Sequence, residues 1–395
     1  MVRSTSLFGQ VLSLINRNEF GRHVKALKAD RRSKGFTCWD QFVAMLFCQL
    51  TQSQSLREIS NGLRCCLGKL NHLGVRSAPK RSTLSYANAH RPWEVYQQVF
   101  FDLLKTCRSA APRKKFRFRN KLLSMDASVI ELCVTMFDWA KYKQTKGAVK
   151  LHMLLDHDGY LPCFALITSG KVHEVRIARA LELPPDSIVA MDRGYLDYGM
   201  FGEWTERGVW FVTRMKRDAV YEVVERRAVP ERRRIRADEI IRLTTSKGET
   251  QCPYDLRRVE VWDEEKQEAF VLLTNHLRFG ATTIAAIYKD RWQIELFFKA
   301  LKQNLKVKTF VGTSANALKI QIWTALIAML LIKYLQFRSR VGWSLSNLVA
   351  LLRLNLFTYR DLWKWIDDPY ETPPESPPEE QIWLPYGDLD SRRFV

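Results

Sequence analysis

Three acidic residues, far apart in the chain, stand where carboxylates could bind divalent metal ions. Asp126 lies within an apolar run (SMDAS), Asp192 closes another (AMDRGY), and Glu295 lies in a helical pattern (YKDRWQIELFFKALK). Mg²⁺ prefers oxygen ligands in octahedral geometry, and two such ions about 4 Å apart can activate the attacking oxygen and stabilise the leaving oxygen of a phosphoryl transfer. Three converging carboxylates would suit that chemistry.

Asp192 ends a short, nearly all-apolar run, 187–192, which is typical of a buried central strand. The carboxyl ends of such strands are where open α/β sheets bind their ligands. A carboxylate there is costly to bury alone and needs a metal ion or a cation beside it. Arg193 could supply that cation, and this remains the purely structural interpretation of Asp192.

Glu295 belongs to a row of functional side chains on one helical face. Tyr288, Arg291, Glu295 and Lys302 occupy offsets 0, 3, 7 and 14, which fall within an arc of about 60° at 100° per residue. Arg291, Lys302 and the Tyr288 hydroxyl could hold phosphates beside a scissile bond. The alternative is a solvated charged face, which the Glu295–Lys299 spacing would suit. That alternative does not account for the tyrosine or for the length of the row, so we favour a functional one.

The elements around these residues predict an α/β sheet with one antiparallel side. Strands are expected over 122–132, 149–156, 160–168, 187–192 and 209–213, with helices over 172–181 and up to about 207. Residues 215–280 interrupt this rhythm with an Arg-rich, β-rich insertion that contains strands 256–262 and 269–273. Helices over 283–305 and 315–337 follow within 281–366, and the acidic, Pro-rich tail 367–395 is expected to be extended or disordered.

Residues 1–112 are expected to be all-helical. A late helix starting at Ser82 or Thr83 would present Ser85, Asn88, His90 and Arg91, as the DNA-reading helix of a helix-turn-helix does. An ordinary helical bundle with a basic surface explains the same pattern, and the two alternatives stay open. The following segment, 113–121 (RKKFRFRNK), could grip phosphates or could be a solvated start of the first strand.

Composition points to a polyanionic partner. The chain has 395 residues, with 62 Lys and Arg against 42 Asp and Glu, a net charge of +20 that nucleic acid commonly offsets. The eight cysteines form no CxxC pair beside histidines, so they are expected to be reduced and mostly buried, without a zinc site. The most prominent uninterrupted apolar stretch, 325–332, is far shorter than the ~20 residues that span a bilayer, so no membrane partner is expected.

The spacing Tyr288–x2–Arg291–x3–Glu295–x6–Lys302 closely resembles the signature of the insertion-sequence-four family of DDE transposases. Asp126 with Ser128 resembles the first Asp region of that family, and Asp192-Arg-Gly-Tyr resembles its second. The resemblance covers about residues 120–335, and the β-rich insertion and the helical N-terminal region also fit this family.

The resemblance implies an RNase H-like core, formed by 113–214 and 281–366, with Asp126 and Asp192 on adjacent strands and Glu295 facing them. It implies that these three residues are catalytic and bind two Mg²⁺ (or Mn²⁺) ions. It also implies cut-and-paste transposition, with end cleavage and strand transfer. The partners would be double-stranded DNA with terminal inverted repeats and target DNA, bound by a homodimer in a synaptic complex. A cytoplasmic, nucleoid-associated protein is expected.

Some relatives hold a flipped base against an aromatic residue, for which Trp262 and Trp292 are the candidates here, although ordinary packing is the stronger interpretation of both. His173–Glu174 could touch DNA or a metal-bound water, and a surface helix start is again the stronger interpretation. Three alternatives to a transposase remain: an RNase H-like nuclease without strand transfer, a transposase-derived DNA-binding protein, and a basic RNA- or ribosome-binding protein, which would not explain the three acidic residues.

Overall fold

The computed structural model describes residues 5–373, except residues 32, 67, 113–114, 133–136, 138, 140, 144–145, 230–233, 306 and 308–309. Part of the basic segment 113–121, part of the Arg-rich run of the insertion and most of the Pro-rich tail therefore lie outside the described residues.

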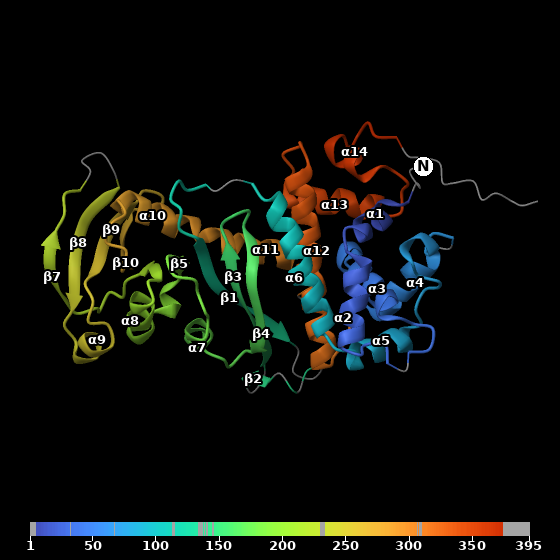
Figure 1. Ribbon diagram of the computed structural model, residues 1–395, viewed down its shortest axis with the longest axis horizontal. Helices are drawn as coiled ribbons and strands as arrows, with labels where there is room; N and C mark the ends of the chain where they lie inside the picture. The colour runs from blue at the N-terminus through green and yellow to red at the C-terminus, as the bar shows by residue number, and fades with distance from the viewer. Residues whose placement is uncertain are drawn as a thin grey trace, which may run out of the picture.

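A large mixed sheet forms the centre and one end of the molecule (Figure 1). Its first half is built from β1 (Leu122–Leu132), β2 (Lys141–Lys143), β3 (Lys146–Asp156), β4 (Leu161–Ser169), β5 (Ile188–Met191) and β6 (Trp210–Arg214). β1 pairs antiparallel with β3, and β3 pairs antiparallel with β4. On its other side β1 pairs parallel with β5, which pairs parallel with β6. The predicted α/β class, with an antiparallel side to the sheet, is confirmed at this level.

Residues 215–280 continue the same sheet. Strand β10 (Glu268–Thr274) pairs antiparallel with β6 and covers the backbone edge that β6 would otherwise expose. The order then runs through β9 (Leu256–Asp263) and β8 (Ile235–Leu243) to the edge strand β7 (Tyr221–Arg226). The short helix α9 (Ser246–Gln251) connects β8 to β9. The insertion is thus rich in β-structure as expected, and its strands widen the sheet.

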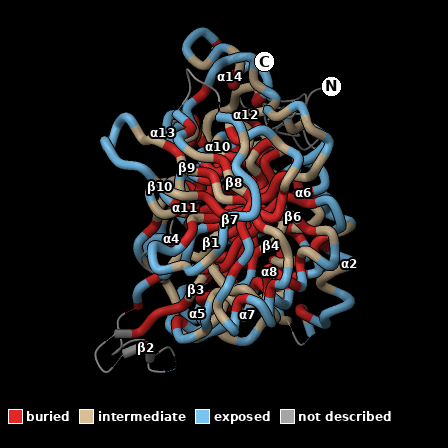
Figure 2. The backbone as a smooth tube through the Cα atoms, turned by 90° about the vertical axis from the view of Figure 1, so that its left-hand side faces the viewer, coloured by how far each residue is buried: buried red, intermediate tan, exposed pale blue. Residues whose placement is uncertain are grey.

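Helices cover both faces of the sheet. Successive side chains of a strand point to opposite faces, so one strand can contribute apolar side chains to two cores. On β1, Leu123 and Met125 join a core with α7 (Glu174–Arg179) and α8 (Tyr198–Glu206). Leu122 instead joins a core with α10 (Ala281–Asp290) on the other face. Figure 2 shows the buried residues gathered around the strands, with exposed residues on the outer turns.

The single helix expected over 283–305 is two helices in the structure, and this expectation is corrected. α10 ends at Asp290 and α11 (Trp292–Asn304) begins after Arg291. The backbone N–H of Arg291 is shared between the carbonyls of Ile287 and Tyr288, both at 3.2 Å, which tightens the turn. The side chain of Asp290 is buried and bonded to residues of other elements. Tertiary contacts therefore fix the point at which the helix breaks.

The remaining helices form a body beside the sheet, on the right of Figure 1. Its members are α1 (Leu7–Ser13), α2 (Arg17–Ala26), α3 (Cys38–Thr51), α4 (Leu56–Cys65), α5 (Arg81–His90), α6 (Glu94–Ala110), α12 (Ala315–Arg338), α13 (Leu345–Asn355) and α14 (Leu362–Asp367). N-terminal and C-terminal helices share one hydrophobic core, which also includes one face of β3. The central member is α12, which contacts α3, α5, α6 and α13.

Helix α12 is long and apolar enough to cross a membrane by length and composition, with a mean hydropathy of 1.7, and 83% of that window is buried inside the protein. This helix is longer than the apolar stretch 325–332 predicted from the sequence. Its buried part also contains polar residues such as Gln321 and Thr324, which are fully buried. Trp323, at its centre, stacks on Trp93 with ring centroids 6.2 Å apart. Of the seven described cysteines, all free, four are buried.

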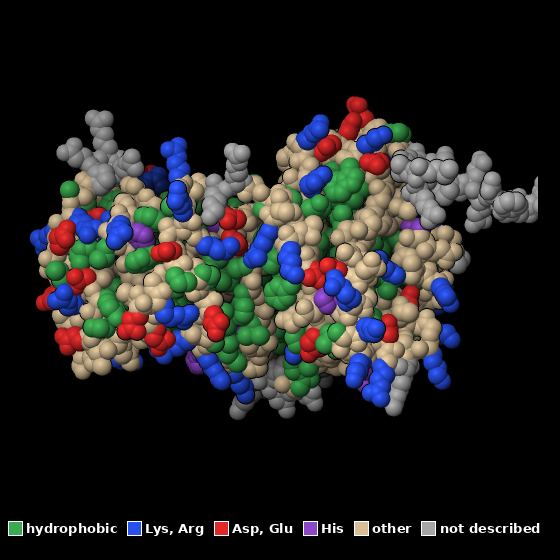
Figure 3. Space-filling view, viewed as in Figure 1, with side chains coloured by type: hydrophobic (Ala, Val, Ile, Leu, Met, Phe, Trp, Pro, Cys, Tyr) green, Lys and Arg blue, Asp and Glu red, His purple; other side chains and the backbone are tan. Residues whose placement is uncertain are grey.

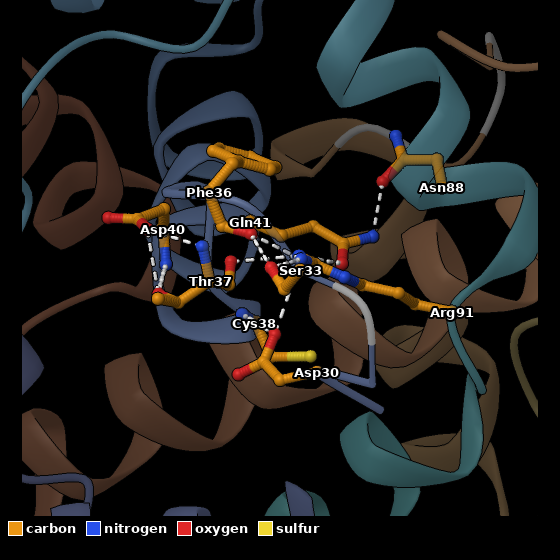
Figure 4. Close-up of polar contacts among 9 residues, drawn as sticks. All are labelled: Asp30, Ser33, Phe36, Thr37, Cys38, Asp40, Gln41, Asn88 and Arg91. Carbon is orange, nitrogen blue, oxygen red and sulfur yellow. Dashed lines mark hydrogen bonds and ion pairs between the residues drawn. The ribbon is translucent and has the colours of Figure 1, made fainter. Parts of the chain in front are cut away.

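Two of the four polar side chains expected to face DNA on the late N-terminal helix, Asn88 and Arg91, point into the protein instead (Figure 4). Asn88 is 1% exposed and accepts a hydrogen bond from Gln41 at 2.8 Å. Arg91 donates to the carbonyls of Phe36 and Thr37, and pairs with Asp30 at 3.2 Å. Asn88 and Arg91 therefore hold α5 against the start of α3, and their expected outward placement is wrong. Ser85 and His90 are exposed on α5 as expected.

Replacing Arg91 tests this structural role. Arg91→Ala is expected to lower the free energy of unfolding by about 1–2 kcal/mol, because two carbonyls and a partly buried carboxylate lose their donor. Arg81→Ala, at an exposed position at the start of α5, is the matched control and should leave stability unchanged. Urea denaturation of both variants measures the difference, and equal stabilities would contradict the structural assignment of Arg91.

Candidate active site

Strand pairing brings Asp126 and Asp192 to the same place in the sheet. Leu122–Met125 of β1 pair in parallel with Ile188–Met191 of β5, residue for residue, so Asp126 and Asp192 follow the last pair, Met125 and Met191. Asp126 is partly buried, and its Oδ1 accepts a hydrogen bond from the Ala127 N–H at 2.8 Å. Asp192 is exposed, and its Oδ1 accepts from the backbone N–H of Arg193 at 2.6 Å. The hydrogen bond between Asp192 and Arg193 thus involves the main-chain N–H of Arg193.

Helix α11 places Glu295 over the middle of β1, beside Asp126. Glu295 is in the first turn of the helix and its side chain is 32% exposed. It lines an open pocket together with Asp126, Ser128, Phe298, Lys299, Lys302 and Gln303. The structure therefore brings Glu295 to Asp126 across about 170 residues of sequence, as the sequence motifs predict.

The electrostatic environment of Asp126 disfavours its charged form. Burial is the largest cause and raises the pKa of the Asp126 carboxyl to about 6. The Ala127 N–H and the Arg291 guanidinium lower this pKa, whereas the negative charges of Glu295 and Asp192 raise it further. The carboxylates thus lie close enough to repel one another, and a cation placed among them would relieve that repulsion.

Arg291 and Tyr288 form the wall of the site beside Glu295. The guanidinium of Arg291 donates to Glu295 Oε1 at 2.7 Å, and its Nε is buried with no hydrogen-bond partner. The Tyr288 ring is 8% exposed and lies 5.3 Å from the Arg291 guanidinium. Burial raises the pKa of the Tyr288 hydroxyl, although the charges of Arg291 and Arg214 lower it. Tyr288 is therefore an internal member of the row and not part of a solvated face.

The other residues singled out in the sequence lie at varying distances from the pocket. Lys302 donates from Nζ to the Val129 carbonyl of β1 at 3.1 Å. Trp292 is 54% exposed at the start of α11. Trp262, in the insertion, lies under the Arg236 guanidinium at 3.6 Å. His173 is an exposed N-cap residue of α7. None of these placements tests the expected contacts with DNA.

Two features of the site were not anticipated from the sequence. The hydroxyl of Tyr195 is buried without a hydrogen-bond partner, and burial raises its pKa, as do the nearby charges of Asp126, Glu174 and Asp192. The second feature is a chain of hydrogen bonds from Ser124 through His157 to Asp290. The sequence signals were only the position of Tyr195 in DRGY and that of His157 in a turn, and neither indicates a tertiary partner.

The comparisons with known proteins agree with this geometry. The family model described as "Transposase DDE domain" matches residues 117–331, more than half of the chain, and a domain of unknown function (DUF4372) matches residues 3–76. The chain belongs to the DDE transposase family. It is a DNA transposase, an enzyme that cleaves DNA and transfers strands.

Two relatives illustrate the match. A putative transposase, y4zB, of Sinorhizobium fredii is 32% identical over 72% of this transposase and 80% of that protein. A putative transposase for insertion sequence element IS4SA of Synechocystis is 23% identical over 85% of this chain and 94% of that protein. Among solved structures, a cryo-EM structure of a piggyBac transposase synaptic complex with hairpin DNA covers 91% of this chain at 9% identity. Its TM-score of 0.41 does not establish a shared fold.

DDE transposase domains generally use divalent metal ions. Within the described residues, no three His, Cys, Asp or Glu side chains lie close enough together to hold a metal as they stand. Glu295 is turned onto Arg291. The donor set nonetheless fits a hard cation, since Asp126, Asp192 and Glu295 offer carboxylate oxygens around a spot where negative charge is unfavourable. These are the residues of the transposase that would hold the metal.

The raised pKa of Asp126 gives a prediction about stability. Ionised Asp126 destabilises the folded transposase above about pH 6, and this penalty falls as the pH drops toward the ordinary carboxyl pKa of 3.8. Without divalent metal, Asp126→Asn is therefore expected to raise stability by about 1–3 kcal/mol at pH 7.5 and by less at pH 5. Thermal unfolding at both pH values measures this.

The exposed Asp218 supplies the matched control, and Asp218→Asn should change stability at neither pH. A stabilisation by Asp126→Asn of the same size at pH 5 and pH 7.5, or none at all, would contradict the electrostatic account.

Proposed function

We propose that this transposase moves its element by cut-and-paste transposition, with Asp126, Asp192 and Glu295 binding two Mg²⁺ (or Mn²⁺) ions. One observation carries the proposal. Asp126 and Asp192 follow paired residues on neighbouring parallel strands, and Glu295 lines a pocket with Asp126. No other described acidic residue lines that pocket.

We infer that the first half of the sheet is an RNase H-like core. The support is the strand order β4–β3–β1–β5–β6, with the first two pairings antiparallel and the last two parallel. In such a core Asp126 would sit on the central strand and Asp192 at the end of its parallel neighbour. Helices α10 and α11 would then cover the face of the sheet on which Glu295 meets these two aspartates.

The chain's own residues would bind and orient the DNA backbone. Bound divalent ions would activate the attacking oxygen and stabilise the leaving oxygen of each phosphoryl transfer. Arg291, whose guanidinium already contacts Glu295, is the cation placed to bind a phosphate beside the carboxylates. Lys302 offers a second cation at the far end of the pocket, and Tyr288 packs beside Arg291 and restricts its position.

DNA contacts would extend beyond the pocket. Lys and Arg side chains are spread over the face in Figure 3, among fewer acidic ones. On α5, Tyr86 is 68% exposed and stacks on His90 with ring centroids 4.0 Å apart. This exposed stacked pair suits contact with nucleic acid bases. Trp292, exposed next to Arg291, is a further base-stacking position.

The partners and location follow from the same proposal. Double-stranded DNA with terminal inverted repeats and target DNA would be bound by a homodimer in the synaptic complex. An enzyme acting on chromosomal DNA would be cytoplasmic and associated with the nucleoid, without a membrane partner.

Cleavage of DNA carrying the flanking terminal repeats tests the proposed site. Wild-type protein with Mg²⁺ should cut at the element ends and join them to a target. Glu295→Gln should bind the same DNA but cut at least about 100-fold more slowly, because a metal ligand is lost while the shape is kept. Glu203→Gln, which changes a half-exposed glutamate of α8 on the other face of the sheet, should cut at the wild-type rate.

The outcomes separate the alternatives. Equal cutting by wild type and Glu295→Gln would place the metal site elsewhere. Binding without cutting by both would favour a transposase-derived DNA-binding protein, and cutting without joining would favour a nuclease that lacks strand transfer.

A further inference from the structure

A buried chain of hydrogen bonds joins β1 to the end of α10. Ser124 Oγ lies 2.6 Å from Nε2 of His157, and Nδ1 of His157 lies 2.7 Å from Oδ2 of Asp290. Ser124, His157 and Asp290 are 0%, 6% and 4% exposed. They come from three separate parts of the sequence, so only the fold brings them together.

The direction of each bond in this chain is set by Asp290. Burial would raise the pKa of its carboxyl, but hydrogen bonds from His157 and Lys115 lower it to about 2. The carboxylate can only accept, so His157 donates from Nδ1, and in a neutral imidazole Nε2 then accepts the hydroxyl proton of Ser124. Ser124 is fully buried, which excludes the arrangement from acting as a hydrolytic triad on a substrate.

The two ends of the chain lead to opposite sides of the active-site pocket. Ser124 lies two residues before Asp126 on β1, so both side chains point to the same face of the sheet. Asp290 directly precedes Arg291, whose guanidinium holds Glu295 at 2.7 Å. His157 therefore links the strand that carries Asp126 to the helix junction that carries Arg291 and Glu295.

The turn that carries His157 is itself fixed in place. The Tyr160 hydroxyl donates to Asp290 Oδ2 at 3.0 Å, and Lys333 of α12 donates to the Gly159 carbonyl at 3.3 Å. Gly159 has φ +78°, and a Cβ there would meet Ala111 at 2.9 Å and Phe337 at 3.1 Å. This turn between β3 and β4 cannot slide without disturbing the helical body, so it is a rigid point of attachment.

We propose that Ser124, His157 and Asp290 are positioning residues that fix the separation between Asp126 and the Arg291–Glu295 pair, and so set the rate of DNA cleavage. The proposal rests on the function proposed above. A misplacement of about 1 Å in a catalytic group can cost about 100-fold in rate. A hydrogen-bonded link that is buried and fully satisfied is a direct way for the fold to prevent such a misplacement.

Breaking the chain at either end tests the proposal. Ser124→Ala and Asp290→Asn are each expected to lower kcat for cleavage of terminal-repeat DNA by about 10- to 100-fold, with little change in Kd for that DNA. Because one link serves both sides of the pocket, the double variant should be no slower than the slower single variant. His157→Asn, whose amide can replace Nδ1 but not reach Ser124, should behave like Ser124→Ala.

A second measurement separates positioning from stability. Hydrogen exchange of residues 122–132 and 284–300 should speed up in Ser124→Ala and Asp290→Asn. The matched control is Asp238→Asn, which breaks the buried ion pair with Arg257, 2.7 Å long, in the insertion. It should lower the melting temperature but leave kcat, and exchange in those two segments, unchanged under conditions where the protein is folded.

The proposal is overturned if Ser124→Ala and Asp290→Asn lower only the melting temperature, as Asp238→Asn does, or if their kcat defects simply multiply. Should Asp290→Asn fail to fold, Ser124→Ala, which removes a single oxygen atom, decides the matter alone. A wild-type protein that does not cut would refute the proposed function instead, and the exchange measurement would still test the positioning chain.

Discussion

Mutual repulsion among carboxylates is the constraint around which the catalytic half of this protein is organised. Asp126, Asp192 and Glu295 come together where burial already raises the pKa of Asp126 to about 6. The parallel pairing of β1 with β5 fixes two of them, and Arg291 neutralises the third at 2.7 Å. The folded protein therefore keeps together charges that would separate if the backbone allowed it, and rigid supports around the pocket follow from that need.

Much of this site could be predicted from the sequence because local patterns of apolar residues and residue spacing indicate the strands and the helix that hold the three acidic residues. The strands of Asp126 and Asp192 have apolar runs of the right length, and their carboxylates stand in or at the end of those runs. The placement of Glu295 needed the spacing of the row from Tyr288 to Lys302. The break at Arg291 could not be predicted, since it coincides with bonds from Asp290 to His157 and Lys115, which are distant in sequence.

In the N-terminal helices, by contrast, a local pattern led to a wrong prediction of which side chains face outward. Asn88 and Arg91 are polar, and polar residues on a short basic helix usually face solvent or a ligand. Here Arg91 donates to the Phe36 and Thr37 carbonyls before α3, and Asn88 accepts from Gln41 within α3. Arg257 in the insertion is likewise buried against Asp238. Part of the basic excess of this chain therefore serves internal pairing, and a charge count overstates the surface available to a polyanion.

The shared core of the helical body has a consequence for how the chain folds as it is made. Helices α1–α6 end at residue 110, but their core is completed by α12, which ends at residue 338. At typical translation rates the ribosome needs on the order of 10–50 s to synthesise what lies between. Throughout that interval the first hundred residues keep exposed the apolar surface that α12 covers in the finished protein. Completion of this body thus waits until α12 has been made, and chains released before α12 are left with an unfinished core open to chaperones and proteases.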